Sequence, residues 1–250
     1  MTDSSHAAIQ SRTIPYTLDG VTMQGVLAAD SAQKGKRPGV LVVHEWWGRT
    51  PFVEDRTRAL AELGYVGFAL DLFGDAKQTD NPTDASAMSQ EVGGNLPLLT
   101  QRFVAALHAL KSQPEVDPDK IAVIGYCFGG TVALSMIRQG INAAALVTFH
   151  AGVSSLAPIV HEPITTPIHM FTGGNDPFVP TEQVMAVEDE MKKAGAKIQV
   201  TIYPDAQHSF TNPAATAKGK QFDLPLVYDD VLAKDSWNQM HQFFREKFGV

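Results

Sequence analysis

Six almost continuously apolar runs constrain the fold of this 250-residue chain more than any other sequence feature. The runs are VLVVHE (40–45), VGFALDL (66–72), IAVIGYC (121–127), AALVTFH (144–150), IHMFTG (168–173) and IQVTIYP (198–204). Runs of this kind suit strands that are buried on both faces, as in a parallel sheet covered by helices. Amphipathic helical patterns alternate with the runs at residues 53–64, 98–113, 130–140, 181–195 and 234–249.

This order of patterns predicts an α/β fold with one doubly wound, mostly parallel sheet of about eight strands and flanking helices. Two further runs, 12–18 and 21–29, flank Asp19-Gly20, a dipeptide that favours a hairpin, so the first strand pair is expected to be antiparallel. The sequence shows no internal repeat or interdomain linker, and we expect one domain over residues 1–250. The irregular stretch 73–97 is predicted to be a lid or substrate loop with a short helix near 85–92.

Composition argues against several classes of partner. The apolar fraction is 44%, and the formal net charge of −7 comes with no Lys/Arg cluster, so nucleic acid and membrane partners are not expected. The N-terminus has no basic and apolar leader pattern, and no run approaches about 18 apolar residues, so neither a secretory signal nor a membrane span is expected. A single cysteine is compatible with a reducing compartment, and we expect a cytoplasmic protein that is a monomer or small homo-oligomer.

That cysteine lies in a motif that favours nucleophilic chemistry. Gly125-Tyr126-Cys127-Phe128-Gly129 fits the pattern glycine, any residue, nucleophile, any residue, glycine, directly after a strand and before a helix. The turn strains the backbone of the nucleophile, and bulky residues two positions away would clash. The following helix would direct its positive end at the thiol. The alternative is a small buried cysteine packed among glycines.

A nucleophile of this type needs a base and an orienting acid, and the chain supplies both in the expected order. Asp176 lies in the loop after one predicted strand, and His208 lies in the loop after the next. Both loops leave the carboxyl ends of parallel strands, where sheets of this kind build their sites. Asp176 would orient His208, and His208 would exchange protons with the thiol of Cys127. Taken singly, Asp176 could be a turn former and His208 a solvated loop residue.

The motifs HEWWG (44–48), ALDLFG (69–74), GYCFGG (125–130), GGNDPFVP (173–180) and AQHSFTNP (206–213) together resemble the dienelactone hydrolase family of α/β-hydrolases. This family uses cysteine where its relatives use serine. The resemblance implies an α/β-hydrolase fold and hydrolysis of a carboxylic ester or lactone through an acyl-enzyme, without a cofactor. It also implies that Cys127, Asp176 and His208 form a catalytic triad and that Glu45 is an additional carboxylate beside the thiol.

Glu45 follows a predicted central strand, so burial should raise the pKa of its carboxyl group and let it exchange a proton with the thiol. The alternative is a structural ion pair between Glu45 and Arg49. The backbone N–H groups of Trp46 and Phe128 are expected to form the oxyanion hole.

Two positions depart from the family pattern. Its members clamp a substrate carboxylate with two arginines, and Asp75 and Asn212 stand at the corresponding positions here. Neither side chain can make the bidentate contact of arginine, which favours a neutral or differently anchored ester, lactone or thioester substrate. The candidate pocket residues are Trp47, Lys77, His150 and Asn212, with structural packing as the alternative for Trp47 and His150.

Other chemistries fit the sequence less well. His44-Glu45 matches the start of the zinc motif H-E-x-x-H, but Gly48 replaces the second histidine and the segment is a predicted strand, so no metal is expected. A non-catalytic binding protein of the same fold and a thiol redox or electrophile sensor remain as rival functions. The sensor needs an exposed thiol, preferably with a second cysteine to resolve it.

Overall fold

The computed structural model describes residues 8–249, in which strands and helices alternate along most of the chain. The strands are β1 (Ile9–Leu18), β2 (Val21–Asp30), β3 (Arg37–Val43), β4 (Val66–Ala69), β5 (Val116–Tyr126), β6 (Ala145–Phe149), β7 (Ile168–Gly173) and β8 (Ile198–Tyr203). The helices are α1 (Pro51–Glu62), α2 (Pro82–Gly93), α3 (Leu96–Lys111), α4 (Phe128–Arg138), α5 (Thr181–Lys193), α6 (Ala215–Phe222) and α7 (Asp230–Phe248).

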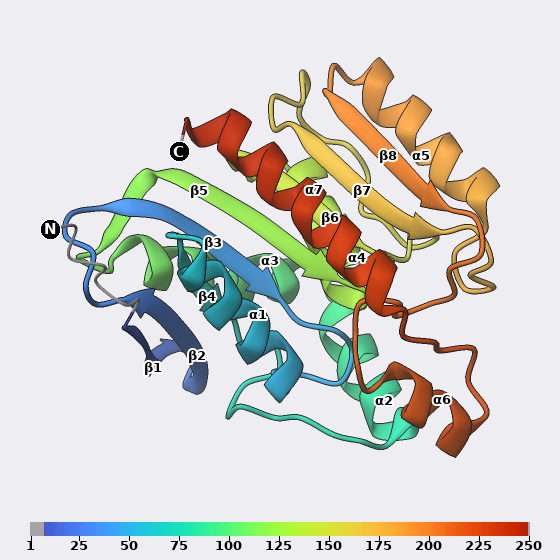
Figure 1. The fold of residues 1–250 in the computed structure, drawn as a ribbon, viewed down its shortest axis with the longest axis horizontal. Helices are drawn as coiled ribbons and strands as arrows, with labels where there is room; N and C mark the ends of the chain where they lie inside the picture. Colours follow the sequence, from blue (N-terminus) through green and yellow to red (C-terminus); the bar gives the residue numbers. More distant parts are fainter. Residues whose placement is uncertain (1–7, 250) are drawn as a thin grey trace, which may run out of the picture.

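All eight strands form one sheet in the order β1-β2-β4-β3-β5-β6-β7-β8 (Figure 1). β1 and β2 form the predicted antiparallel hairpin, which closes with Leu18 opposite Val21, and β2 is also antiparallel to β4. Every other neighbouring pair is parallel. The predicted mostly parallel, doubly wound α/β sheet is therefore confirmed.

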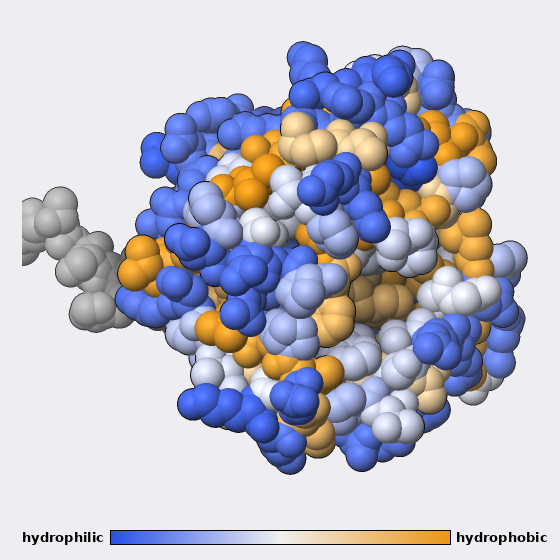
Figure 2. All heavy atoms as spheres, turned by 90° about the vertical axis from the view of Figure 1, so that its right-hand side faces the viewer, coloured by the Kyte–Doolittle hydropathy of each residue, from blue (hydrophilic) through white to orange (hydrophobic). Residues whose placement is uncertain are grey.

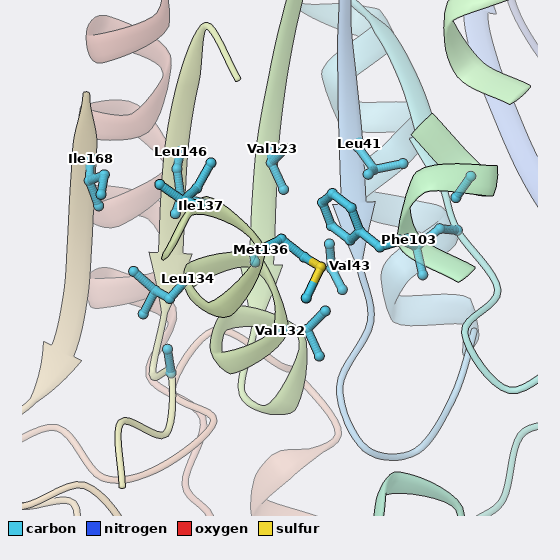
Figure 3. Packing of buried hydrophobic residues seen from close by; sticks show 14 of the residues in the cluster. Leu41, Val43, Phe103, Val123, Val132, Leu134, Met136, Ile137, Leu146 and Ile168 are labelled. Carbon is cyan, nitrogen blue, oxygen red and sulfur yellow. The ribbon is translucent and has the colours of Figure 1, made fainter. Parts of the chain in front are cut away.

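Helices cover both faces of the sheet, and this explains why its central strands are apolar at consecutive positions. On β3, Leu41 and Val43 point into a core shared with α3 and α4, whereas Val40 and Val42 point into a second core shared with α1 and α7. Figure 3 shows side chains of α4 packed against β3, β5, β6 and β7 in the first of these cores. In Figure 1, α7 crosses in front of the sheet and α4 lies behind it.

The parallel strands bring the candidate site residues to one edge of the sheet. Glu45 follows β3, Cys127 follows β5, and His150 follows β6. Asp176 and His208 lie in the loops that follow β7 and β8. The arrowheads of these strands point toward the lower right of Figure 1, so residues that are far apart in the sequence meet at this edge.

Three elements differ from the sequence-based expectation. The stretch 73–97 contains a full helix, α2, and the start of α3, because Asn81 and Asn95 cap the two helices through their side chains. Helix α6 was not predicted at all, since its eight residues lack a clear apolar period. β8 is an edge strand with one half-exposed face, so the prediction of burial on both faces was wrong for its run.

Candidate functional site

Cys127 occupies the sharp turn between β5 and α4. Its backbone has φ 53° and ψ −119°, in the left-handed region that side chains rarely adopt. Its N–H donates to the carbonyl of Phe149 on the neighbouring strand β6 at 3.0 Å. Strain of this kind persists only where surrounding contacts fix it, and here it directs the sulfur out of the sheet at the start of a helix.

The two glycines of the motif are required by close backbone approaches. A Cβ atom on Gly125 would lie 2.4 Å from the carbonyl oxygen of Gly129. A Cβ atom on Gly129 would lie 2.3 Å from the carbonyl oxygen of Val43. Any side chain at either position would displace backbone, so the strand-to-helix turn at Cys127 depends on both glycines.

His208 connects the sulfur of Cys127 to a buried carboxylate. Its Nε2 lies 3.1 Å from Cys127 Sγ, and its Nδ1 lies 2.6 Å from Asp176 Oδ2. The second oxygen of Asp176 accepts the backbone N–H of Phe178 at 2.9 Å. An ionised carboxylate only accepts hydrogen bonds, so Nδ1 carries the proton in this contact and Nε2 is left to exchange a proton with sulfur.

The neighbours of His208 raise its pKa by more than burial lowers it. Burial in the protein lowers the pKa of His208, but the Cys127 sulfur and the Asp176 carboxylate raise it, and the result is about 10. The imidazolium form of His208 is therefore favoured at neutral pH. This arrangement can hold a proton at Nε2 and release it again to a group bound at the sulfur.

Glu45 is fully buried and faces the loop after His208. Its Oε2 accepts from the Asn212 side-chain amide at 2.6 Å, and its Oε1 accepts from the Ser209 hydroxyl at 3.2 Å. Burial raises the pKa of Glu45, and the bonds from Asn212 and Ser209 offset this only in part. Within residues 8–249, no hydrogen bond joins Glu45 to the sulfur of Cys127.

Arg49 does not pair with Glu45, because its guanidinium bonds the carboxylate of Glu54. The position of Glu45 is instead supported by the buried ring of His44. The Nδ1–H of His44 donates to the carbonyl of Glu45 at 2.6 Å, and its Nε2 accepts the N–H of Leu72 at 3.2 Å. Burial lowers the pKa of His44, so the ring is neutral and this pair of bonds fixes its tautomer.

The two expected oxyanion donors belong to residues that line the same cavity as Cys127. Trp46 follows Glu45 directly, and Phe128 is the first residue of α4. Neither backbone N–H has a protein acceptor in the part of the chain that the structure describes. Unpaired amides at the mouth of a pocket are available to a developing negative charge on a ligand.

A cavity of about 270 Å³ opens over Cys127 at this edge of the sheet. Its lining residues are Trp46, Ser89, Cys127, Phe128, Thr131, Gly152, Phe178, Val179, His208, Leu224 and Leu226. Besides Cys127 and His208, no described residue of this lining has an ionisable side chain. Figure 2 looks onto this side of the molecule and shows a hollow whose floor is hydrophobic.

None of the four candidate pocket residues lines this cavity in the described structure. Trp47 is buried between α2 and α6, where the Lys218 ammonium lies 4.0 Å from its ring centroid. Lys77 is exposed. His150 is buried with its Nε2 2.8 Å from the Thr211 hydroxyl and its ring 5.2 Å from that of His208.

The positions of the two absent arginines carry no substitute cation. Asp75 is exposed, and its backbone N–H donates to the carbonyl of Thr22 at 2.7 Å. Asn212 is buried and is used to bind Glu45. Ser209 as the second partner of Glu45 was not predicted, and neither were Leu224 and Leu226 in the cavity wall. The apolar Leu224-Pro-Leu226 segment in a loop was the available signal for the latter pair.

No three His, Cys, Asp or Glu side chains in residues 8–249 gather in a set suited to a metal ion. No helix in the range combines the length and the apolar character that crossing a membrane requires.

Comparison with known proteins gives consistent matches over nearly the whole chain. The model of the Dienelactone hydrolase family matches residues 23–248. Protein usf of Aquifex pyrophilus is 30% identical over 93% of this chain and 97% of its own length. A protein of Aquifex aeolicus (strain VF5) named "Putative carboxymethylenebutenolidase" is 28% identical over 93% of this chain and 96% of its own.

Among solved structures, a dienelactone hydrolase-like promiscuous phosphotriesterase from metagenomic libraries superposes with a TM-score of 0.87. It is 34% identical in sequence, and the match covers 96% of this chain and 99% of that one.

Proposed function

Because the chain belongs to the dienelactone hydrolase family and is an ester or lactone hydrolase, we propose that Cys127, His208 and Asp176 form its catalytic triad. The observation that supports this proposal is the continuous line of contacts from Asp176 through His208 to the sulfur, which ends in an apolar cavity. Each contact has the length of a hydrogen bond that can carry a proton.

The reaction proceeds through an acyl-enzyme. The sulfur of Cys127 attacks the ester carbonyl while Nε2 of His208 holds the thiol proton, and the carbonyl oxygen becomes an oxyanion bound by the N–H groups of Trp46 and Phe128. Collapse of this intermediate breaks the ester C–O bond, and Nε2–H of His208 protonates the leaving alkoxide. His208 then removes a proton from water, whose oxygen attacks the thioester and releases the acid and the Cys127 thiol.

The substrate is an uncharged ester or lactone. Apart from His208, which is paired with Asp176 and Cys127, no described lining residue of the cavity over Cys127 is cationic, so no free cation there would replace the hydration of a substrate carboxylate. Asp75 and Asn212 stand where the family clamps an anionic substrate, and Asn212 is committed to Glu45. An anionic dienelactone would therefore be a poor substrate.

Glu45 acts as a positioning residue in this mechanism. It accepts hydrogen bonds from Ser209 and Asn212, both on the loop that carries His208, and so restrains the histidine relative to β3. The raised pKa of Glu45 lets it hold a proton, which it would then donate to the Ser209 hydroxyl. Exchange of a proton with the sulfur would require Glu45 to leave Asn212.

A screen of substrates tests the proposal. Purified protein is assayed with neutral esters, neutral lactones and anionic lactones, with Cys127→Ala as the blank. We expect turnover of neutral substrates by the wild type and none above background by the variant. A clear preference for anionic lactones would contradict the proposed substrate class, and full activity of Cys127→Ala would contradict the triad.

One relative suggests a second candidate activity. The structural neighbour at 34% identity is described as a promiscuous phosphotriesterase, and a phosphotriester, like the proposed ester, is uncharged. The cavity over Cys127, which has no lysine or arginine among its described lining residues, suits such a substrate. Release of nitrophenol from a nitrophenyl dialkyl phosphate, lost in Cys127→Ala, would support this activity. Absence of release at protein concentrations that hydrolyse carboxylic esters would exclude it.

A further inference from the structure

A second and larger cavity, of about 500 Å³, lies next to the one over Cys127. Its lining residues are Ser89, Gln90, Gly93, Gly94, Leu96, Leu99, Phe128, Thr131, Val132, Ser135, Ser155 and Ala157. Ser89, Phe128 and Thr131 line both cavities. The two spaces are therefore adjacent, and the residues that they share belong to α2 and α4.

The second cavity is uncharged, and three of its four described hydroxyl groups make hydrogen bonds within the protein. Thr131 Oγ1 donates to the Gly152 carbonyl at 2.7 Å, and Ser89 Oγ donates to the Ser86 carbonyl at 3.1 Å. Ser135 Oγ accepts the backbone N–H of Ala157 at 3.1 Å. None of the described residues in this lining is acidic, basic or histidine. An occupant gains little from charge here and gains most from burial of apolar surface.

Phe128 links the second cavity to the reacting centre. Its ring stacks on Phe73 at a centroid distance of 6.2 Å, and it packs so close to α2 that a Cβ atom on Gly93 would lie 2.9 Å from the ring. The backbone N–H of the same residue is a proposed oxyanion donor. A carbonyl group bound at that N–H therefore lies next to a residue that lines both cavities.

We propose that the second cavity is a subsite for the distal part of a long, uncharged ester whose carbonyl is attacked by Cys127. The proposal rests on the proposed function and specifies its substrate class, namely esters with an extended alkyl or aryl chain rather than short or anionic ones. The smaller cavity alone accommodates a short chain. A longer chain passes Phe128 and buries its end against Leu96, Leu99 and Val132.

The test measures kcat/KM on nitrophenyl acetate, butanoate, octanoate and decanoate. In the wild type we expect the value to rise with chain length, because each methylene group that enters the cavity gains burial. Ala157→Trp places a bulky ring in the second cavity while the backbone contacts of Ala157 stay available. This variant should lose about tenfold on decanoate, mainly through KM, and keep its butanoate activity within about twofold.

Two further variants control for folding and for bulk. Ser155 is an exposed residue of the same lining, so Ser155→Trp tests the proposal even if Ala157→Trp does not fold. Val160 is 52% exposed on the same loop and outside the lining, and Val160→Trp should leave the chain-length profile unchanged.

The subsite and the proposed function fail in different ways. A flat chain-length profile in the wild type, or an equal loss on butanoate and decanoate in both lining variants, would overturn the subsite. Absence of turnover on every ester of the series would instead overturn the proposed function.

Discussion

Two clusters of polar side chains meet at the loop after β8, and they differ in access to solvent and in how their partners affect pKa. The first, here called the triad line, consists of Cys127, His208 and Asp176 and ends at an open cavity. The second, here called the Glu45 group, consists of Glu45, Ser209 and Asn212 and is sealed from solvent, with Glu45 only 1% exposed.

The difference lies in the charge of the partners. In the triad line, the Cys127 sulfur and the Asp176 carboxylate raise the pKa of His208 and stabilise its charged form. In the Glu45 group, burial disfavours the charged form of Glu45 and raises its pKa. The neutral donors Asn212 and Ser209 offset this only in part. A group with ionised partners and access to a cavity suits proton transfer, whereas a sealed group with neutral partners suits positioning.

Removal of the Cys127 sulfur should lower activity more than any change in the Glu45 group. Cys127→Ala should lower kcat/KM on a neutral ester by at least about 10³-fold, because the triad line then has no nucleophile. Its free energy of unfolding should stay within about 1 kcal/mol of the wild type, because the cysteine sulfur faces a cavity. Steady-state kinetics and chemical denaturation measure the two quantities. A loss of only a few fold would contradict the assignment of Cys127.

The next largest loss of activity should come from replacement of Asp176, the carboxylate of the triad line. Asp176→Asn keeps the shape of the side chain but removes the anion that orients His208 and stabilises its imidazolium. We expect kcat to fall by on the order of 10²- to 10⁴-fold, as for the equivalent change in serine hydrolases. The matched control is Asp205→Asn, a change of the same charge at an exposed residue in the loop before His208, which should leave kcat unchanged. Equal kcat values for the two variants would contradict the triad.

Glu45→Gln should raise the free energy of unfolding at neutral pH. Since burial raises the pKa of Glu45 above 4.5, the unfolded chain loses this proton first as pH rises, and the folded state becomes less stable up to its own pKa. Glutamine accepts from Asn212 and donates to Ser209 without that cost. The variant should therefore gain on the order of 1 kcal/mol at neutral pH, or about 2–4 °C in Tm.

The pH dependence distinguishes this explanation from better packing. The gain from Glu45→Gln should disappear as pH falls below 4.5, where Glu45 is protonated in both folded and unfolded chains. Thermal melts of both proteins across pH measure it. A gain that persists in acid would indicate better packing of the glutamine, and a loss of stability at neutral pH would show that Glu45 is an ordinary paired carboxylate. The kcat of Glu45→Gln should fall far less than that of Cys127→Ala.

The smallest expected effect comes from a change in α2, which lines both cavities and belongs to neither the triad line nor the Glu45 group. Asn81 caps α2 by accepting the N–H of Thr83 at 2.8 Å, and Asn81→Ala should cost about 1 kcal/mol of unfolding free energy. Activity on short esters should stay within about twofold, because α2 contributes Ser89 but no member of the triad line. Denaturant titration measures the stability. A drop in short-ester activity as large as that of Asp176→Asn would mean that α2 takes part in catalysis.

The sequence predicted what local rules and sheet topology determine. The spacing of Gly125, Cys127 and Gly129 identifies a strand-to-helix turn because backbone contacts exclude side chains at both glycines. Asp176 and His208 could be placed at the same edge because the carboxyl ends of parallel strands meet there. The structure brings these residues within hydrogen-bond distance, and their catalytic roles stay predictions.

The directions of loop side chains could not be predicted in the same way. The orientation of Asn212 toward Glu45 depends on the turn after His208, where Ser209 has φ 59°, a conformation with no glycine to signal it. Trp47 follows the site residue Trp46 directly, yet it packs between α2 and α6, and α6 itself was not predicted. These positions depend on tertiary contacts that sequence periodicity does not encode.

The most direct test of the central claim is the mass of the protein during turnover of an activated neutral ester. Rapid acid quenching of wild type with nitrophenyl butanoate, followed by peptide mapping, should locate one butanoyl group on Cys127, and Cys127→Ala should carry none. Asp176→Asn should accumulate the same adduct more slowly. Turnover without acylation of Cys127, or acylation of another residue at the same rate in Cys127→Ala, would contradict a thioester intermediate.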